Sequence, residues 1–378
     1  MTGRERVRLA TSHKEPDRIP LDLWGSDSRL NTDLYLRVIK YLGWEEPGPC
    51  IRPASTSAYE DYRLSDLIGS DFRHINIGKP DNFKSYTDSD GNTIDEWGIG
   101  RKLIGKYPSF SMHPFAETNI DDIKTHAWPD MSDPGRVRGL EEQARDWYET
   151  TDFAITATSA TSGTIFDICQ YLCGMEEFFT SLYVEPEFAE ALIEKVTDII
   201  IELNVLYMRS VGQYMEWLEF SSDFGTQMGP LISPDIYKKF FLKPYKRLFD
   251  AVKKASPNVK IFLHCCGAVR LLLPLFIESG VDVISAIQPL AAGMGDSAGL
   301  KAEFGSELVF HGGIDIQRAI HGTFDELYEE CKTRIRAFAS GGGYILSPSN
   351  HFMDDVKVEN FFKMYEFGKE LGQYPIEL

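Results

Sequence analysis

The sequence predicts an α/β fold, a closed (β/α)8 (TIM) barrel with an inserted hairpin-rich segment near the barrel mouth. Short β-branched runs alternate with amphipathic stretches, and strands that alternate with helices form a parallel sheet. Eight such runs can be distinguished, and 378 residues are within the range of one barrel with insertions. No GxGxxG motif opens the first helix, which disfavours a doubly wound sheet.

Each expected strand is an apolar or β-branched run that ends near glycine, aspartate, serine or proline. The runs cover residues 19–24, 71–76, 153–158, 215–221, 259–264, 281–286, 308–311 and 344–347. The second of them has the weakest pattern. Together they supply the number of strands that closes a barrel.

Amphipathic stretches between these runs predict the covering helices. They include residues 186–210, which form the longest, and residues 269–279, 323–339 and 356–371. A further helix begins at Ser233 and Pro234, because serine is a good N-cap and proline suits the first helical position.

Residues 80–136 interrupt the alternation. They are rich in aspartate, glycine and aromatic residues, and they contain DSDGNTIDEWG, which is typical of a hairpin. We therefore expect a single barrel domain over residues 1–378, with residues 80–136 inserted over its mouth.

Composition excludes several function classes. The formal net charge is −18 without any basic cluster, so neither nucleic acid nor an anionic membrane surface is an expected partner. No apolar stretch approaches the roughly 18 residues of a membrane span, and the N-terminal residues lack the apolar core of a signal peptide. The six cysteines show no disulfide-framework spacing, which predicts a cytoplasmic protein with reduced thiols.

The segment KIFLHCCGAV carries the strongest candidate site. Its apolar strand ends in His264, Cys265 and Cys266. Because side chains alternate along a strand, His264 and Cys266 share one face and Cys265 points to the other. Imidazole and thiolate are zinc ligands, so we expect the pair to bind metal at the barrel mouth and Cys265 to pack against helices. A buried packing pair is the alternative that the sequence leaves open.

A third metal ligand is expected from the end of the last strand. His351 and Asn350 are both within reach of the mouth, and His351 is the chemically better ligand.

Other strands also end in polar residues, and the functional groups of a barrel gather at the carboxyl ends of its strands. Candidate catalytic residues are Asp223, Gln288 and Asp315. Candidate substrate-binding residues are Asp22, Trp24, Ser26 and Ser222. A turn-capping role for Asp223 fits the pattern equally well. For Asp315 the alternative is a loop in which the preceding glycines supply a positive φ.

Several stretches together resemble the uroporphyrinogen decarboxylase superfamily. They are EPDRIPLDLWG, SSDFGTQMGPLISPDIYKKFFLKPYKRL, LHCCGAVRLLLPLFIESGVDVISAIQP, HGGIDIQ and GGGYILSPSNHF with VENF after it. They span almost the whole chain apart from the inserted segment. The resemblance implies a (β/α)8 barrel, in agreement with the strand count.

The superfamily holds metal-free porphyrinogen decarboxylases and corrinoid-dependent methyltransferases. The resemblance to the methyltransferases implies that His264 and Cys266 bind zinc and that the 349–351 loop completes the site. Those enzymes commonly have cysteine where this chain has Asn350. It also implies a corrinoid (cobalamin) methyl carrier on a partner protein, and it leaves a homodimer open, since such barrels often pair.

The sequence thus favours a zinc-dependent methyltransferase that moves a methyl group between a corrinoid and a thiol, methoxy or methylamine compound or a folate. Asp223 and Gln288 would orient the substrate, and Trp24 with the aromatic residues of the insertion would exclude water.

The first alternative is a metal-free decarboxylase in which Asp71 or Asp223 handles the proton. The loop after the first strand argues against it, because family decarboxylases carry arginines there and this chain has Asp22, Asp27 and a single Arg29. The second alternative is a non-catalytic binder of a tetrapyrrole or corrinoid.

Overall fold

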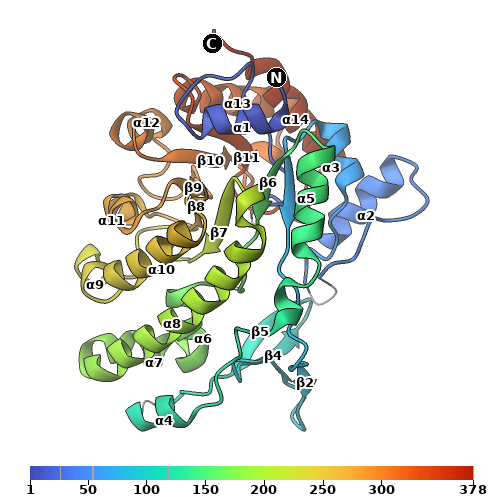
Figure 1. Ribbon diagram of the computed structural model, residues 1–378. Coiled ribbons are helices and arrows are strands. Elements are labelled where there is room, and N and C mark those ends of the chain that lie inside the picture. The colour runs from blue at the N-terminus through green and yellow to red at the C-terminus, as the bar shows by residue number, and fades with distance from the viewer. Residues whose placement is uncertain (26, 53–54, 118, 378) are drawn as a thin grey trace.

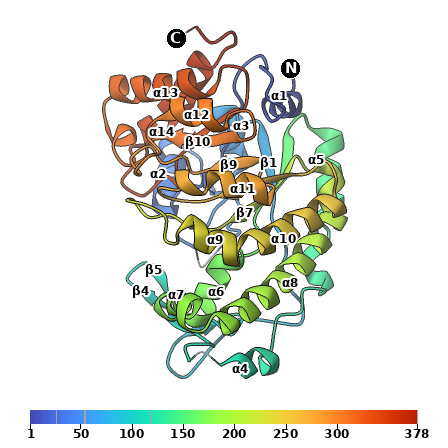
Figure 2. The same cartoon turned by 90° about the vertical axis from the view of Figure 1, so that its left-hand side faces the viewer.

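A computed structural model describes residues 1–25, 27–52, 55–117 and 119–377. Seven parallel strands form one curled sheet in the order β1-β6-β7-β8-β9-β10-β11, and helices cover its outer face (Figures 1 and 2). The strands are β1 (Phe72–Ile75), β6 (Ala154–Ala157), β7 (Trp217–Ser221), β8 (Lys260–His264), β9 (Val283–Ser285), β10 (Val309–Ile314) and β11 (Tyr344–Pro348). Each lies within or overlaps one of the last seven predicted strands.

The helices alternate with the strands as predicted. They are α1 (Gly3–Ala10), α2 (Thr32–Tyr41), α3 (Tyr62–Ile68), α4 (Ile120–Thr125), α5 (Leu140–Thr150), α6 (Ile165–Cys173), α7 (Met175–Val184), α8 (Pro186–Val211), α9 (Pro234–Phe240), α10 (Leu242–Ala255), α11 (Leu273–Ser279), α12 (Ser297–Phe304), α13 (Phe324–Phe338) and α14 (Val358–Leu371). Short 3-10 helices are η1 (Pro134–Val137), η2 (Gly212–Tyr214), η3 (Arg270–Leu272) and η4 (Ala319–His321). Ser233 caps α9 as expected, since its side chain accepts the N–H of Ile236.

The prediction of a first strand at residues 19–24 was wrong, because these residues do not form a regular strand. The segment lies between β11 and β1, but only Leu21 forms a bridge, to Leu346. Pro20 has no N–H to donate, and the N–H of Leu21 goes to the Asp71 carboxylate at 2.9 Å rather than to a strand. Trp24 then turns out of extended geometry with φ of 80°. The gap between the edge strands is therefore spanned by an irregular segment.

Residues 80–136 contain a second sheet of four antiparallel strands, β2 (Tyr86–Thr87), β3 (Thr93–Ile94), β4 (Gly100–Ile104) and β5 (Tyr107–Met112). Figures 1 and 2 place β4 and β5 beside α6 and α7, at the end of the molecule away from the termini. Lys106 at the β4–β5 turn pairs with Asp33 at 2.6 Å and lies 3.8 Å from Asp354, which follows β11. That this segment is an insertion in the barrel stays a prediction.

The barrel interior is layered by the two-residue period of its strands. The deeper layer is an apolar cluster: Val7, Phe72, Ala154, Trp217, Phe262, Val283, Val309 and Ile345. Two residues further along each strand, the interior position is polar, and all of these side chains are buried: His74, Thr156, Glu219, His264, Ser285, His311 and Ser347. The change from apolar to polar marks the carboxyl ends of the strands as the functional end.

Within the described residues, no helix is both long enough and apolar enough to cross a membrane.

Candidate active site and metal centre

A pocket of about 660 Å³ opens at the carboxyl ends of the strands. Its lining residues come from the ends of five strands, from the loops that follow them and from the segment after α2: Ile51, Arg52, Ser55, Asn76, Ile77, Thr158, Ser159, Ala160, Thr161, Ser162, Ser221, Asp223, His264, Cys266, Asn350 and His351. The lining combines several hydroxyl groups with an imidazole, a thiol and a carboxylate. Four of the predicted site residues therefore share one cavity: Asp223, His264, Cys266 and His351.

Three side chains in this pocket could hold a metal ion. One possible ligand atom from each of Asp223, His264 and Cys266 lies within 4.8 Å of the other two. His264 Nε2 is 3.2 Å from Cys266 Sγ and 3.8 Å from Asp223 Oδ1. Tetrahedral zinc with arms of about 2.0–2.3 Å places its ligand atoms about 3.5 Å apart, so this donor set fits the ion in both chemistry and spacing.

The loop after β8 is held in place by the two flanking loops. Asp223 Oδ1 accepts the N–H of Cys266 at 2.9 Å, and Gln288 Oε1 accepts the N–H of Gly267 at 2.9 Å. Cys265 faces the other way and is buried, with the N–H of Phe224 directed at its sulfur. The alternation predicted for the two thiols is thus seen in the structure.

Two amides point at the sulfur of Cys266. Asn350 Nδ2 donates to Sγ at 3.1 Å, and Gln288 Nε2 donates at 3.5 Å. Amide N–H donors stabilise a thiolate over a thiol. Gln288 therefore contacts the site through Cys266 and through the backbone of the same loop.

His351 lies in the pocket wall but outside the three-residue cluster. Its Nδ1 accepts the backbone N–H of Arg29 at 3.1 Å. Burial and the nearby Arg29 charge lower the pKa of His351 to about 3, so the ring is neutral at physiological pH. Its predicted role as a metal ligand stays a prediction.

The charges of the cluster residues shift one another's pKa values. Burial favours a neutral His264 ring, but the charges of Cys266, Asp27 and Asp223 outweigh it and raise the pKa of His264 well above its ordinary value. Burial raises the pKa of the Cys266 thiol, and His264 opposes that effect. A cation at this position would remove the burial cost of the thiolate.

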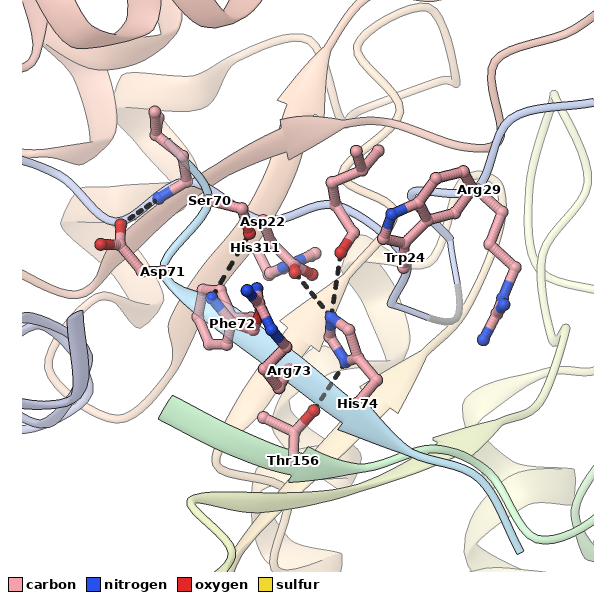
Figure 3. Close-up of polar contacts among 12 residues, drawn as sticks. Asp22, Trp24, Arg29, Ser70, Asp71, Phe72, Arg73, His74, Thr156 and His311 are labelled. Carbon is pink, nitrogen blue, oxygen red and sulfur yellow. Dashed lines mark hydrogen bonds and ion pairs between the residues drawn. The ribbon is translucent and has the colours of Figure 1, made fainter. Parts of the chain in front are cut away.

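The polar interior layer forms a chain of ion pairs, and Figure 3 shows the part of it around Asp22, His74 and His311. Asp22 accepts hydrogen bonds from His74 Nε2 and His311 Nε2, both at 2.9 Å. Ser285 bonds to both Asp27 and His311. Although burial opposes it, the two histidines hold the pKa of Asp22 at about 2, and the carboxylates raise the pKa of His74 to about 10 and that of His311 to about 9.

Three residues predicted to bind substrate at the mouth have buried side chains inside the protein instead. Asp22 is committed to the two histidines. The indole of Trp24 donates to the carbonyl of Asp61, and Trp24 is not among the residues that line the pocket. Ser222 donates to Asp167 and contacts the Tyr245 hydroxyl. Ser26 lies outside the described residues.

Two further aspartates bond to groups of the protein outside the pocket. The Asp315 carboxylate accepts backbone N–H groups from the next turn, with Gln317 N at 2.7 Å, and it does not line the pocket. Asp71, considered as a proton carrier for decarboxylation, is buried between Arg6 and Arg18. Neither is brought together with the metal cluster.

Sequence reasoning missed part of the pocket. Asn76 follows β1, and residues 158–162, four of which carry a hydroxyl group, follow β6, so the strand-end rule that selected Asp223 could have found them. Arg52 precedes α3 in a segment with no strand pattern and had no comparable signal. Among the described lining residues it is the only lysine or arginine.

Comparisons with known proteins agree on a family. The sequence profile described as uroporphyrinogen decarboxylase (URO-D) matches residues 104–371. A methylated-thiol–coenzyme M methyltransferase from Methanosarcina mazei is 29% identical over 174 residues, 45% of this chain and 43% of its own length. The chloroplastic uroporphyrinogen decarboxylase of Nicotiana tabacum is 24% identical over 224 residues, 55% of this chain and 51% of its own. The chain thus spans about half the length of the curated relatives it matches.

One solved structure shares the fold along the whole chain. A methyltransferase from Methanosarcina mazei superposes with a TM-score of 0.69 at 17% identity, covering 98% of this chain and 99% of that one. At this level of identity the likeness shows that the two proteins share a fold.

Proposed function

The chain belongs to the uroporphyrinogen decarboxylase family, and on this premise we propose that it is a zinc-dependent methyltransferase. It would move a methyl group between a corrinoid and a small thiol, methoxy or methylamine compound or a folate. The observation that carries the proposal is the cluster of Asp223, His264 and Cys266 in an open pocket. The methyltransferase relative supports the same branch of the family.

His264 and Cys266 would hold the metal, with Asp223 as the nearest further donor and His351 as the alternative. Bound zinc would supply Lewis acidity, which lowers the pKa of a coordinated thiol or polarises a coordinated oxygen or nitrogen. Cys265 takes no part, because its side chain is buried on the other face of the strand.

The rest of the pocket would bind and orient the substrate. Asp223 is half exposed, with 51% of its side chain accessible, so it can accept a proton or a hydrogen bond from a substrate beside the cluster. Gln288 keeps the Cys266 loop in place through Gly267 and its own amide. The hydroxyl groups of Thr158, Ser159, Thr161 and Ser162 also line the pocket and could hold polar substrate groups.

A corrinoid carried by a partner protein would exchange the methyl group at the open mouth. We also propose a homodimer. Each chain of the dimer would carry a complete site, because all the proposed site residues belong to one chain.

Methyl transfer can be tested directly. Zinc-loaded protein is incubated with methylcobalamin and a panel of thiols, and in the reverse direction with methylated thiols, methanol, methylamines or methyl folate and reduced cobalamin, while cobalamin absorbance is followed. We expect turnover with at least one substrate, loss of at least about 100-fold in Cys266→Ala, and near wild-type turnover in the matched variant Cys265→Ala. Corrinoid binding without turnover on any substrate would contradict the proposal and favour a binding protein.

A second candidate is metal-free decarboxylation, which the decarboxylase relative and the Arg52 side chain in the pocket favour. Burial and the neighbouring Arg29 lower the pKa of Arg52 to about 10, which leaves it cationic and able to meet a carboxylate. Release of carbon dioxide from a porphyrinogen by chelator-treated protein would support this candidate against methyl transfer.

A further inference from the structure

A buried carboxylate lies behind the imidazole of the proposed metal site. His264 Nε2 faces Cys266 and Asp223, whereas Nδ1 faces Asp27 Oδ2 at 3.6 Å. We propose that Asp27 is a positioning residue for His264: it accepts Nδ1–H and thereby fixes Nε2 as the nitrogen that holds zinc. The inference rests on the proposed zinc site. It adds to that site a residue from the loop that follows the irregular segment 19–24.

An unsatisfied nitrogen at this contact supports the proposal. Within the described part of the chain, His264 Nδ1 is buried and has no hydrogen-bond partner. Buried polar atoms are normally satisfied, so Nδ1 needs a partner, and the Asp27 carboxylate lies beside it. A shift of less than about 1 Å would turn the 3.6 Å separation into an ordinary hydrogen bond.

Asp27 is fixed independently of His264. Ser285 on β9 donates to its Oδ2, and His311 Nδ1 on β10 lies 3.7 Å from the same oxygen. His311 is itself held by Asp22 at 2.9 Å. The carboxylate therefore has a defined place before any metal arrives, and it can orient the ring rather than follow it.

The Asp27 contact would affect both the orientation of the His264 ring and the affinity of the site for zinc. An imidazole that donates Nδ1–H to a carboxylate is locked in the tautomer with a free Nε2 lone pair, and it is a more basic ligand. Loss of such a partner costs about 10- to 100-fold in metal affinity.

The test is zinc affinity, measured by competition with a chromophoric chelator in the full chain. Asp27→Asn keeps the size of the side chain but replaces the anionic acceptor, and we expect zinc affinity to fall about 10- to 100-fold. The matched control is Asp71→Asn, another buried aspartate, which pairs with Arg6 and Arg18 and does not contact the cluster. It should keep wild-type zinc affinity even if it lowers stability.

Nitrogen NMR of histidine-labelled protein gives an independent answer that does not depend on the folding of a variant. In the zinc-bound wild type, His264 should bind the metal through Nε2 and carry a hydrogen-bonded proton on Nδ1. Metal on Nδ1, or wild-type zinc affinity in Asp27→Asn, would overturn the inference while leaving the zinc site intact. Absence of zinc binding in the wild type would instead overturn the proposed function, and the inference with it.

Discussion

Cys266 is the residue on which the site converges. It is approached by the imidazole of His264 and by the amides of Asn350 and Gln288, and its N–H is held by Asp223. Strand alternation predicted which of the two adjacent thiols would face the pocket, because that depends only on parity along one strand. It could not predict that Asp223, rather than His351, joins His264 and Cys266 in the cluster, because that depends on how separate loops fold.

The identity of the third ligand can be decided by two substitutions. Asp223 Oδ1 is 3.8 Å from His264 Nε2, whereas His351 uses its Nδ1 to accept the Arg29 N–H. We expect Asp223→Asn to weaken zinc binding by at least about 10-fold and His351→Ala to weaken it less. Chelator competition with each variant measures both effects, and a greater loss in His351→Ala would assign the third position to the histidine instead.

At the scale of elements, the loop after β8 depends on close backbone contact with the loop after β7. Gly267 has φ of 87°, and a Cβ placed on it would lie 2.6 Å from the Thr226 carbonyl oxygen. The glycine therefore lets the Cys266 loop approach its neighbour, and a side chain there would displace the thiol.

Gly267→Ala should lower the free energy of unfolding by about 2 kcal/mol or more and weaken zinc binding, because strain and a backbone clash add. Gly341→Ala is the matched control: its φ is 76°, but nothing lies within 4 Å of the added Cβ. It should cost about 1 kcal/mol and leave zinc affinity unchanged. Urea unfolding and chelator competition measure the two quantities, and equal effects of the two variants would show that the close contact is unimportant.

Seven of the eight strands could be predicted because each contains a short run rich in apolar or β-branched residues, even where a polar residue such as Glu219 or His311 interrupts it. The first could not, because its irregularity comes from a side chain elsewhere: the Asp71 carboxylate takes the N–H of Leu21. The same limit applies to Asp22, Trp24 and Ser222. The sequence places them at the functional end, but the groups that they bond to inside the protein come from segments far away in the sequence.

At the scale of the whole molecule, the interior of the barrel is polar and charged at the end near the pocket. Asp22 lies between His74 and His311, and each member of this chain is fully buried. The alternation Phe72-x-His74 and Val309-x-His311 is visible in the sequence, but the pairing of the histidines with Asp22 depends on the register of three separate segments.

This network predicts a stability maximum in mildly acidic solution. The pKa of Asp22 is lowered from 3.8 to about 2, so its contribution is present above pH 3.8 and is lost as pH falls through 2. The pKa of His74 is raised from 6.5 to about 10, so its contribution is complete below pH 6.5 and is lost as pH rises towards 10. Stability should therefore fall on the alkaline side by on the order of 1 kcal/mol per pH unit.

Urea unfolding at about pH 6 and about pH 9 measures that slope. In His74→Asn the protein should be less stable and the alkaline slope smaller. His321→Gln changes a half-buried histidine at the end of η4, outside the network, and should keep the wild-type slope. An unfolding free energy that is constant or rises over this interval in the wild type would contradict the assigned charges.

The zinc content of the protein purified without added metal is the most direct test of the central claim. The wild type and Cys265→Ala should each contain about one zinc per chain, and Cys266→Ala should contain none. Zinc retained in Cys266→Ala, or absent from all three proteins, would contradict a zinc site at His264 and Cys266.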